Sequence, residues 1–238
     1  MKIKNSVAFV TGANRGLGLA FARALLAGGA RKVYAAARNP AGVTLSGVEP
    51  IRLDVTRPQE ITVAVRECGD VNLLINNAGI ALSTSFLADE GLKAARAEIE
   101  TNYLGPLAVS QAFAPVLARN GGGAIINVNS VLSWINVPFG ATYSASKSAS
   151  WSLTNGLRNE LSGQGTQVLA LHVALIDTDM ASHIHGAKSD PNEVVRGTLA
   201  ALEAGKEEFI ADEITRQVKQ GLSAEPGIYL SFKYPEAA

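Results

Sequence analysis

Three residues in the middle of the chain could move a proton together: Ser130, Tyr143 and Lys147. The tyrosine and the lysine are four positions apart in a predicted helix, which places both side chains on one face. A free tyrosine has a pKa of about 10, and a neighbouring ammonium group stabilises its phenolate and lowers that pKa. Such a tyrosine can act as a general acid or base near neutral pH. We therefore predict proton-transfer chemistry at Tyr143.

The tyrosine–lysine spacing is weak evidence by itself, because Tyr229 and Lys233 repeat it near the C-terminus. The presence of Ser130 distinguishes the first tyrosine–lysine pair from the second. Ser130 stands thirteen residues before the first tyrosine, at the end of a predicted strand, and ligands of doubly wound sheets bind at that edge. The residue at the same distance before Tyr229 is Arg216, which has no hydroxyl. We interpret the second pair as a chance match.

Apolar runs bounded by turn residues alternate with helical patterns along the whole chain. The predicted strands are 6–10, 32–37, 51–55, 71–76, 124–129, 167–173 and 208–211. The predicted helices are 17–27, 58–68, 91–119, 142–161 and 192–204, the third interrupted by Pro106 and Pro115. Apolar strands separated by helices imply a parallel sheet covered on both faces. The predicted fold class is α/β: one doubly wound, Rossmann-type domain over 1–238, with helices on both faces of about seven parallel strands.

The composition excludes several other classes of protein. Lys plus Arg and Asp plus Glu both number 21, which gives no support for binding nucleic acid or an anionic membrane. No run approaches the roughly 20 apolar residues of a membrane span, and no signal peptide is visible. The single cysteine, Cys68, fits a reducing compartment. A cytoplasmic protein with a small-molecule substrate is the prediction.

A glycine-rich loop follows the first predicted strand and leads into the first predicted helix. Gly12 permits a tight turn, Gly16 lets the backbone approach a pyrophosphate, and Gly18 allows close packing of the helix on the sheet. The start of the helix then offers N–H groups and a positive dipole end to phosphate. This placement indicates a dinucleotide site.

The end of the second predicted strand indicates which dinucleotide. An NAD site usually carries a carboxylate there for the ribose 2′-hydroxyl, but here Ala37 stands at that position and Arg38 follows. Arg15 lies in the glycine loop itself. Two guanidinium groups can hold a 2′-phosphate, so we predict NADP(H) in preference to NAD(H). The alternative is that both arginines are solvated surface residues.

Several motifs stand in one order along the chain. They are the glycine loop 11–18, Asp54, Asn76-Asn77-Ala78-Gly79, Asn102, Ser130, Tyr143 and Lys147. With them the chain resembles the short-chain dehydrogenase/reductase family over nearly its full length, in particular the carbonyl reductases that prefer NADP.

The resemblance implies a catalytic role for Ser130, Tyr143, Lys147 and Asn102. Ser130 would hydrogen-bond the substrate oxygen, and Tyr143 would deliver the proton while hydride leaves the nicotinamide ring. In the reverse direction Tyr143 would act as base. Lys147 would bond the nicotinamide ribose, and Asn102, in a kinked helix, would hold a water that links Lys147 to solvent.

The resemblance also implies the cofactor contacts. Asp54 would meet the adenine, Asn77 the adenosine ribose, and Ile176 and Thr178 the carboxamide. The full predicted cofactor-binding set is Gly12, Asn14, Arg15, Gly16, Leu17, Gly18, Arg38, Asp54, Val55, Asn77, Ala78, Gly79, Tyr143, Lys147, Ile176 and Thr178.

The chain departs from the family pattern in two places. Ala174 and Leu175 replace the usual Pro-Gly after the sixth strand, so we expect an altered pocket with cofactor binding retained. Residues 208–212 lack the usual Asp-Gly-Gly turn, in a region that helps to build one interface of a tetramer in relatives. The other interface uses helices like those at 92–119 and 142–161. We expect a homo-oligomer, either a dimer or a tetramer.

The predicted substrate pocket is mostly apolar, and no Arg or Lys is placed to hold a carboxylate or phosphate. Its predicted substrate-binding residues are Ser130, Leu132, Trp134, Phe139, Tyr143 and Leu175, with Ile80, Val131, Ile135 and the substrate loop 181–191 nearby. This favours a hydrophobic ketone, aldehyde or secondary alcohol; steroids, aryl ketones and aliphatic carbonyls all fit. The tail 224–238 is not assigned a role.

No metal site is predicted. His183 and His185 stand in a loop with no cysteine nearby and no clear third ligand, and His172 is expected to be a satisfied core residue. Two other functions remain open. A cofactor-sensing protein on the same fold does not need the catalytic set, which is complete here. The second open function is a different enzyme on the same fold, such as a dehydratase or a halohydrin dehalogenase. A dehalogenase, however, is expected to have Arg at the position of Lys147.

Overall fold

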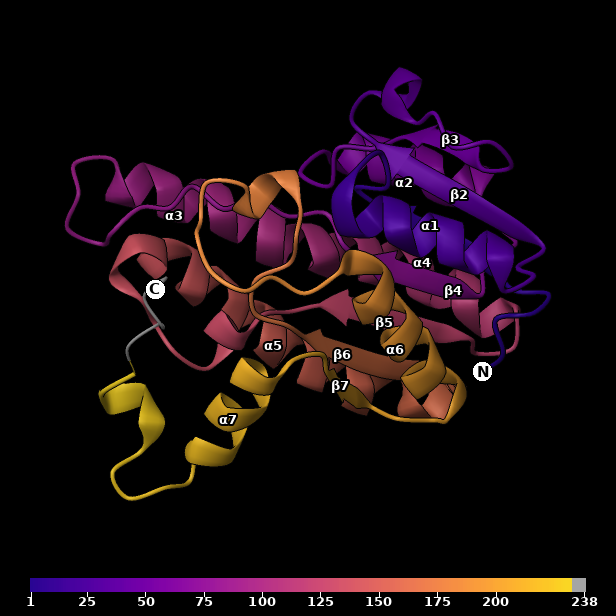
Figure 1. Ribbon diagram of the computed structural model, residues 1–238. Coiled ribbons are helices and arrows are strands. Elements are labelled where there is room, and N and C mark those ends of the chain that lie inside the picture. Colours follow the sequence, from indigo (N-terminus) through magenta and orange to yellow (C-terminus); the bar gives the residue numbers. More distant parts are fainter. Residues whose placement is uncertain (233–238) are drawn as a thin grey trace.

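The structure, a computed structural model, describes residues 1–232 and contains the predicted sheet. Seven parallel strands lie in the order β3-β2-β1-β4-β5-β6-β7. The edge strands of this sheet are β3 and β7 (Figure 1). The strands are β1 Val7–Thr11, β2 Lys32–Ala37, β3 Glu49–Arg52, β4 Leu73–Asn76, β5 Ala124–Val128, β6 Gln167–His172 and β7 Glu208–Ile210. The order reverses between β1 and β4, and such a reversal opens a crevice at the carboxyl ends of the strands.

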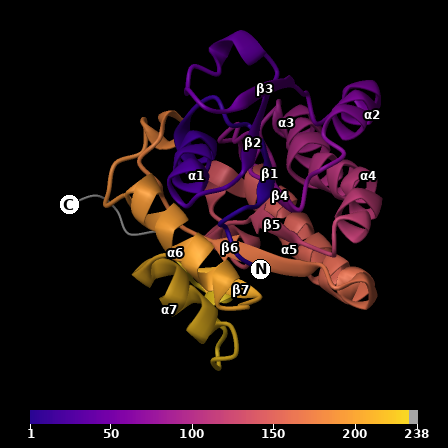
Figure 2. The same ribbon diagram turned by 90° about the vertical axis from the view of Figure 1, so that its right-hand side faces the viewer.

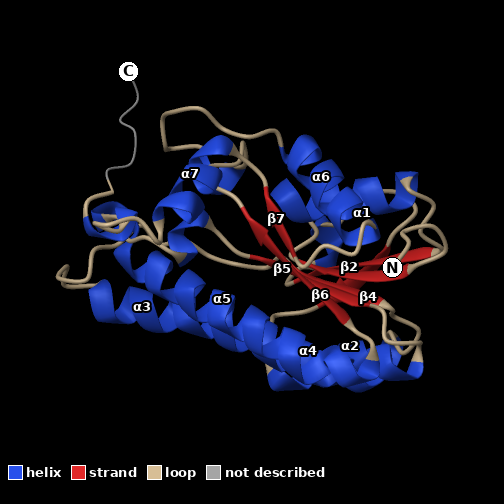
Figure 3. Ribbon diagram, turned by 90° about the horizontal axis from the view of Figure 1, so that it is seen from below, coloured by secondary structure: helices blue, strands red, loops and turns tan. Residues whose placement is uncertain are grey.

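Helices cover both faces of the sheet, as the view along the layers shows (Figure 2). One face carries α1 Gly16–Ala27 and α6 Pro191–Glu203, and the other carries α2 Pro58–Glu67, α4 Gly105–Arg119 and α5 Ala141–Leu161. Beyond them are α3 Gly91–Ile99, which packs on α5, and α7 Glu213–Gly221 after the last strand (Figure 3). The doubly wound α/β prediction is therefore confirmed.

The alternation of side chains along β1 explains why both faces are apolar. Val7 and Phe9 pack toward α4, where Phe113 is fully buried, and Ala8 and Val10 pack toward α1. Burying an aromatic side chain of this size stabilises the fold by roughly 2–3 kcal/mol. A strand enclosed on both sides has no polar positions, which is why the sequence shows continuous apolar runs.

The third strand and the long helical stretch differ most from the sequence predictions. The third strand is 49–52 rather than 51–55, because its partner β2 ends where Ala37 pairs with Arg52. The prolines do not interrupt the long helical stretch: Pro106 is in the first turn of α4, where a missing N–H costs little, and Pro115 is exposed inside α4. The irregularity is instead a π-helical turn, Glu100–Leu104, between α3 and α4.

No helix within residues 1–232 is both long and apolar enough to cross a membrane. The tail predicted as 224–238 lies partly outside the described residues. Lys233, which forms the chance pair with Tyr229 in the sequence, also lies outside them. Its described part includes one short turn, Ile228–Leu230, in which Tyr229 is exposed.

A matched pair of glycine variants tests how β5 is started. Gly121 and Gly123 both have positive φ, but a Cβ on Gly123 would lie 2.1 Å from the Asn72 carbonyl oxygen, whereas one on Gly121 meets nothing within 4 Å. We expect Gly123→Ala to lower the free energy of unfolding by about 1–3 kcal/mol more than Gly121→Ala does. Urea denaturation measures both. Equal losses would contradict the packing of Gly123 against the backbone of Asn72, directly before β4.

Candidate active site

A cavity of about 660 Å³ opens at the carboxyl ends of the central strands. Most of the residues predicted from the sequence line it. They are Gly12, Asn14, Arg15, Gly16, Leu17, Arg38, Asp54, Val55, Asn77, Ala78, Gly79, Ser130, Leu132, Phe139, Tyr143, Lys147, Leu175, Ile176 and Thr178. Four residues that the sequence analysis names do not line it: Gly18, Asn102, Trp134 and Ile135.

The glycine loop leaves the start of α1 open to an anion. Arg15 is the N-cap residue but makes no side-chain cap, and the first turn of α1 has no acidic residue. Gly12 and Gly16 both have positive φ, at 66° and 53°. Gly18 packs the helix on the loop, since a Cβ there would lie 2.2 Å from the Gly12 carbonyl oxygen. Unpaired N–H groups at a helix start fit the pyrophosphate of a dinucleotide.

Thr11, which the sequence analysis did not single out, fixes this loop to β4. Its Oγ1 donates to the Ile75 carbonyl at 3.3 Å and accepts the backbone N–H groups of Asn77 and Ala78, each at 2.9 Å. The Asn77 amide donates in return to the carbonyls of Thr11 and Gly12. Asn77 therefore lines the cavity, but its side-chain N–H groups donate to backbone carbonyls of the glycine loop. The only sequence signal was a threonine at the end of an apolar strand.

The far end of the cavity carries positive charge. Arg38 is exposed there, beside Asp54, which lies beyond the end of β3. Partial burial favours the neutral form of Asp54, but hydrogen bonds from Thr56, aided by the charges of Arg38 and Arg57, hold the pKa of its carboxyl below the usual value. Arg15 pairs with Asp179 at 3.3 Å, and both side chains are largely exposed. An exposed pair is worth under about 1 kcal/mol, so Arg15 can exchange this partner for a phosphate.

Ser130, Tyr143 and Lys147 all line the cavity near the end of β5. Ser130 Oγ accepts the Leu132 N–H at 3.1 Å and interacts with the Tyr143 hydroxyl. Lys147 Nζ donates to the Val128 carbonyl at 2.8 Å and lies 5.6 Å from the centre of the Tyr143 ring. The structure thus brings Ser130, which follows β5, to the part of α5 that carries Tyr143 and Lys147.

The expected fall in the pKa of Tyr143 is not found. Burial raises the pKa of Tyr143 well above its usual value, and the charge of Glu98 acts in the same direction, against the hydrogen bond with Ser130. Burial also lowers the pKa of Lys147 to about 8. A neighbouring ammonium group lowers the pKa of a tyrosine, but the loss of solvent around Tyr143 is the larger effect here.

Asn102 lies behind the cavity wall, in the π-helical turn that replaces the predicted kink. Its amide accepts from and donates to the backbone of Ile80, both at 2.9 Å, and donates to Ser146 Oγ at 2.9 Å. Ser146 donates in turn to the Tyr143 carbonyl at 2.7 Å. Asn102 therefore ties the wall residue Ile80 to the helix that carries the tyrosine. Ser146 was not predicted.

Comparison with known proteins identifies the family. The family model for short chain dehydrogenases matches residues 6–188. The chain belongs to the short-chain dehydrogenase family. A short chain dehydrogenase from Burkholderia cenocepacia J2315, solved in complex with NADP, is 40% identical, with a TM-score of 0.91 over 95% of this chain and 96% of that one.

More distant short-chain dehydrogenases differ in their substrates. A gluconate 5-dehydrogenase from the same organism, solved with NADP and tartrate, is 25% identical, with a TM-score of 0.81 over 91% of this chain and 97% of that one. A 3alpha-hydroxysteroid dehydrogenase from Mediterraneibacter gnavus is 30% identical over 87% of this chain and 85% of its own length. Membership of the short-chain dehydrogenases therefore establishes an oxidoreductase but not its substrate.

Ala174 and Leu175, which stand in place of Pro-Gly in this short-chain dehydrogenase, each make a backbone hydrogen bond to another part of the chain. The Ala174 N–H, which a proline would lack, donates to Asp212 Oδ2 at 2.7 Å. Asp212 also caps α7 by accepting from the N–H and the hydroxyl of Thr215. Leu175 lines the cavity, and its carbonyl accepts the Ser189 N–H at 2.9 Å, which closes the base of the 181–191 loop. No cluster of metal-ligating side chains occurs within residues 1–232, the loop with His183 and His185 included.

Trp134 and Ile135 were expected on the pocket wall and are not there. The Trp134 ring instead stacks on His172, with ring centres 4.1 Å apart. Leu132, in the short turn Val131–Ser133, lines the cavity, whereas Trp134, directly after this turn, lies against His172 of β6. His172 is buried as expected but only half satisfied: Nδ1 bonds the Ser130 carbonyl, and Nε2 has no hydrogen-bond partner.

His172 makes stability depend on pH. Burial lowers its pKa to about 4 from an ordinary value of 6.5, so the unfolded chain binds its proton first. Stability is therefore lost as pH falls from 6.5 to 4, by on the order of 3 kcal/mol. In urea denaturation across this range, His172→Asn should show a smaller loss than the parent protein. The control is His183→Asn, since His183 is exposed; a parent-like loss in His172→Asn would contradict the assignment.

Proposed function

We propose that the protein transfers hydride between NADP(H) and a hydrophobic ketone, aldehyde or secondary alcohol, with Tyr143 as general acid and base. The observation that carries the proposal is the meeting of Ser130, Tyr143 and Lys147 in one cavity with the open start of α1. The apolar wall around them, which includes Leu132, supports an apolar substrate. Bound NADPH would supply the hydride to the carbonyl carbon.

The residues of this chain would supply the proton. Because the pKa of Tyr143 is raised, its hydroxyl is protonated at neutral pH and suited to donate to the substrate oxygen during reduction. Ser130 Oγ accepts from Leu132, which leaves its own hydrogen for the same oxygen. Lys147 would bind the ribose that is attached to the nicotinamide ring of the cofactor. In oxidation the proton would return to Tyr143.

Charge at the far end of the cavity supports NADP(H) as the cofactor. Arg38 and Arg15 both line it, and no carboxylate follows β2. The solved relative with 40% identity contains NADP, which is consistent with this choice. We also infer that the protein is cytoplasmic and forms a homo-oligomer. The oligomer is supported by the exposed apolar side chains Leu92 and Leu104 along the helical stretch expected to form an interface.

The proton donor is tested by Tyr143→Phe. We expect NADPH-dependent reduction, screened over ketones of increasing bulk, to slow by about 10²–10⁴-fold, because the acid is removed and the ring is kept. NADPH affinity, measured by fluorescence titration, should not change. The matched control is Tyr229→Phe, which removes an exposed hydroxyl with the same spacing to a lysine. Parent-like turnover in Tyr143→Phe would contradict the role of Tyr143, and NADPH binding without turnover of any ketone or alcohol would favour a cofactor sensor.

The phosphate site is tested by Arg38→Asp. We expect the ratio of kcat/KM for NADPH to that for NADH to fall at least about tenfold, since a hydrogen bond to a charged group is worth about 1.5–3 kcal/mol. Arg31→Asp is the control, because it makes the same charge change at the opposite end of β2, where Arg31 is exposed. An unchanged ratio in Arg38→Asp would contradict the assignment.

A further inference from the structure

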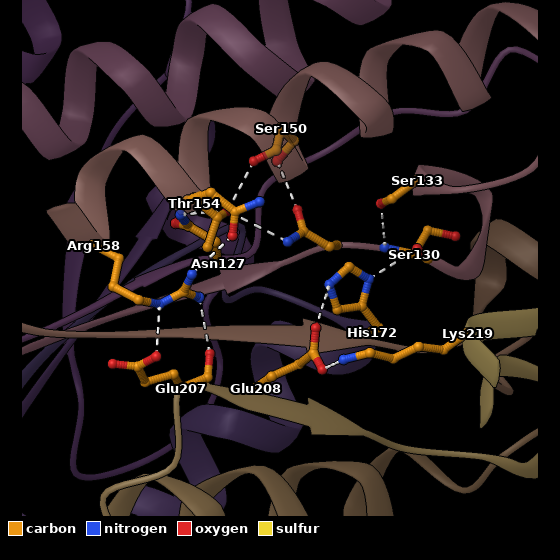
Figure 4. Close-up of polar contacts among 12 residues, drawn as sticks. Asn127, Ser130, Ser133, Ser150, Thr154, Arg158, His172, Glu207, Glu208 and Lys219 are labelled. Carbon is orange, nitrogen blue, oxygen red and sulfur yellow. Dashed lines mark hydrogen bonds and ion pairs between the residues drawn. The ribbon is translucent and has the colours of Figure 1, made fainter. Parts of the chain in front are cut away.

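A buried histidine stands directly behind the proposed catalytic serine. His172 ends β6, and its side chain is fully buried. Its Nδ1 lies 3.1 Å from the backbone carbonyl oxygen of Ser130. A dashed line in Figure 4 marks this contact between His172 and Ser130. A carbonyl oxygen can only accept, so the hydrogen of the neutral ring must be on Nδ1. Because burial lowers the pKa of His172 to about 4, the ring is neutral at physiological pH and keeps this tautomer.

The ring of His172 is held from two sides. Trp134 stacks on one face at a 19° angle, and Lys219 of α7 lies over the Trp134 ring, 5.8 Å from its centre. On the edge away from Ser130, Glu208 Oε1 of β7 is 3.8 Å from Nε2, and Glu208 forms an ion pair with Lys219 (Figure 4). Besides these groups, the charges of Lys147 and Arg158 on α5 also act on His172. The ring therefore has one orientation, with Nδ1 aimed at Ser130.

The bond from His172 completes the backbone contacts of Ser130. The Ser130 N–H donates to Ser133 Oγ at 3.3 Å, and the neighbouring Val131 N–H donates to the Val173 carbonyl at 3.0 Å. The Ser130 carbonyl accepts the Ser133 N–H and the His172 Nδ1–H. The direction in which Oγ points follows from this backbone. A displacement of about 1 Å at a reacting group can cost about 100-fold in rate.

We propose that His172 is a positioning residue, which fixes Ser130 in its reactive orientation through the Nδ1–H bond to the Ser130 carbonyl. The proposal rests on the proposed function, in which Ser130 binds the substrate oxygen. His172 itself does not line the cavity and does not touch substrate or cofactor. Its effect is therefore expected in kcat and not in the binding of NADPH.

The test compares three substitutions that separate a donor at the position of Nδ1 from the bulk of the ring. The Asn side chain can place its amide nitrogen where Nδ1 lies, the Gln amide reaches instead toward Nε2 and Glu208, and Leu has no donor. We expect His172→Leu to lower kcat about 100-fold with NADPH affinity unchanged. His172→Asn should recover most of that loss, and His172→Gln should not.

A purely structural role would give a different order, because Gln fills the space of the ring better than Asn does. If His172→Leu fails to fold, the comparison of Asn with Gln decides. Glu207→Gln is the control, because it makes the same change one residue before Glu208, where the exposed carboxylate pairs with Arg158, and it should keep kcat within about twofold. Equal kcat for Asn and Gln, or parent-like kcat for Leu, would overturn the role of His172 alone. Absence of NADPH-dependent turnover in the parent protein would instead overturn the proposed function, and this proposal with it.

Discussion

One hydroxyl group joins the two strands between which the sheet reverses its order. Thr11, at the end of β1, is buried, and its Oγ1 makes three hydrogen bonds to the backbone of β4 and the residues after it. The Asn77 amide returns two bonds to the glycine loop. The floor of the crevice is thus fixed before any ligand binds, and a preorganised site spends less of its binding energy on ordering itself. The uncapped start of α1 depends on this arrangement.

At the other end of the crevice, burial determines the acid–base behaviour. The neighbouring ammonium of Lys147 would by itself favour a tyrosinate, but loss of solvent is larger and keeps Tyr143 protonated. The same loss of solvent brings the pKa of Lys147 to about 8, so the lysine changes charge more readily than a surface lysine. A reduction needs a proton donor at neutral pH, and a buried tyrosine beside a serine hydroxyl meets that need without an ionised form. Oxidation makes the opposite demand and is expected to favour higher pH.

Features of the fold and the site that depend on the order of strands and motifs could be predicted from the sequence, whereas features that depend on one local turn or on burial could not. The sheet, the glycine loop and the meeting of Ser130 with Tyr143 followed from the sequence, because strand order and motif order fix which strand ends lie together. Trp134 was misplaced because one short turn after Ser130 decides which neighbouring side chain faces the cavity, and periodicity does not register such a turn. The raised pKa of Tyr143 was not predicted, because its main cause is burial, which depends on the whole fold. The four-residue spacing to Lys147 carries no information about burial.

The two departures from the family pattern are parts of one arrangement. With proline at 174 there would be no N–H for Asp212, and without Asp212 the start of α7 would lose its cap. Seated in this way, α7 packs Val218 against Val131 and Ile135 and holds Lys219 over Trp134. Through the Trp134 ring and Glu208, the same helix limits the movement of His172, which bonds the Ser130 carbonyl. The segment from Glu208 to the end of α7 therefore supports, in this chain, the backbone beneath Ser130, the proposed catalytic serine.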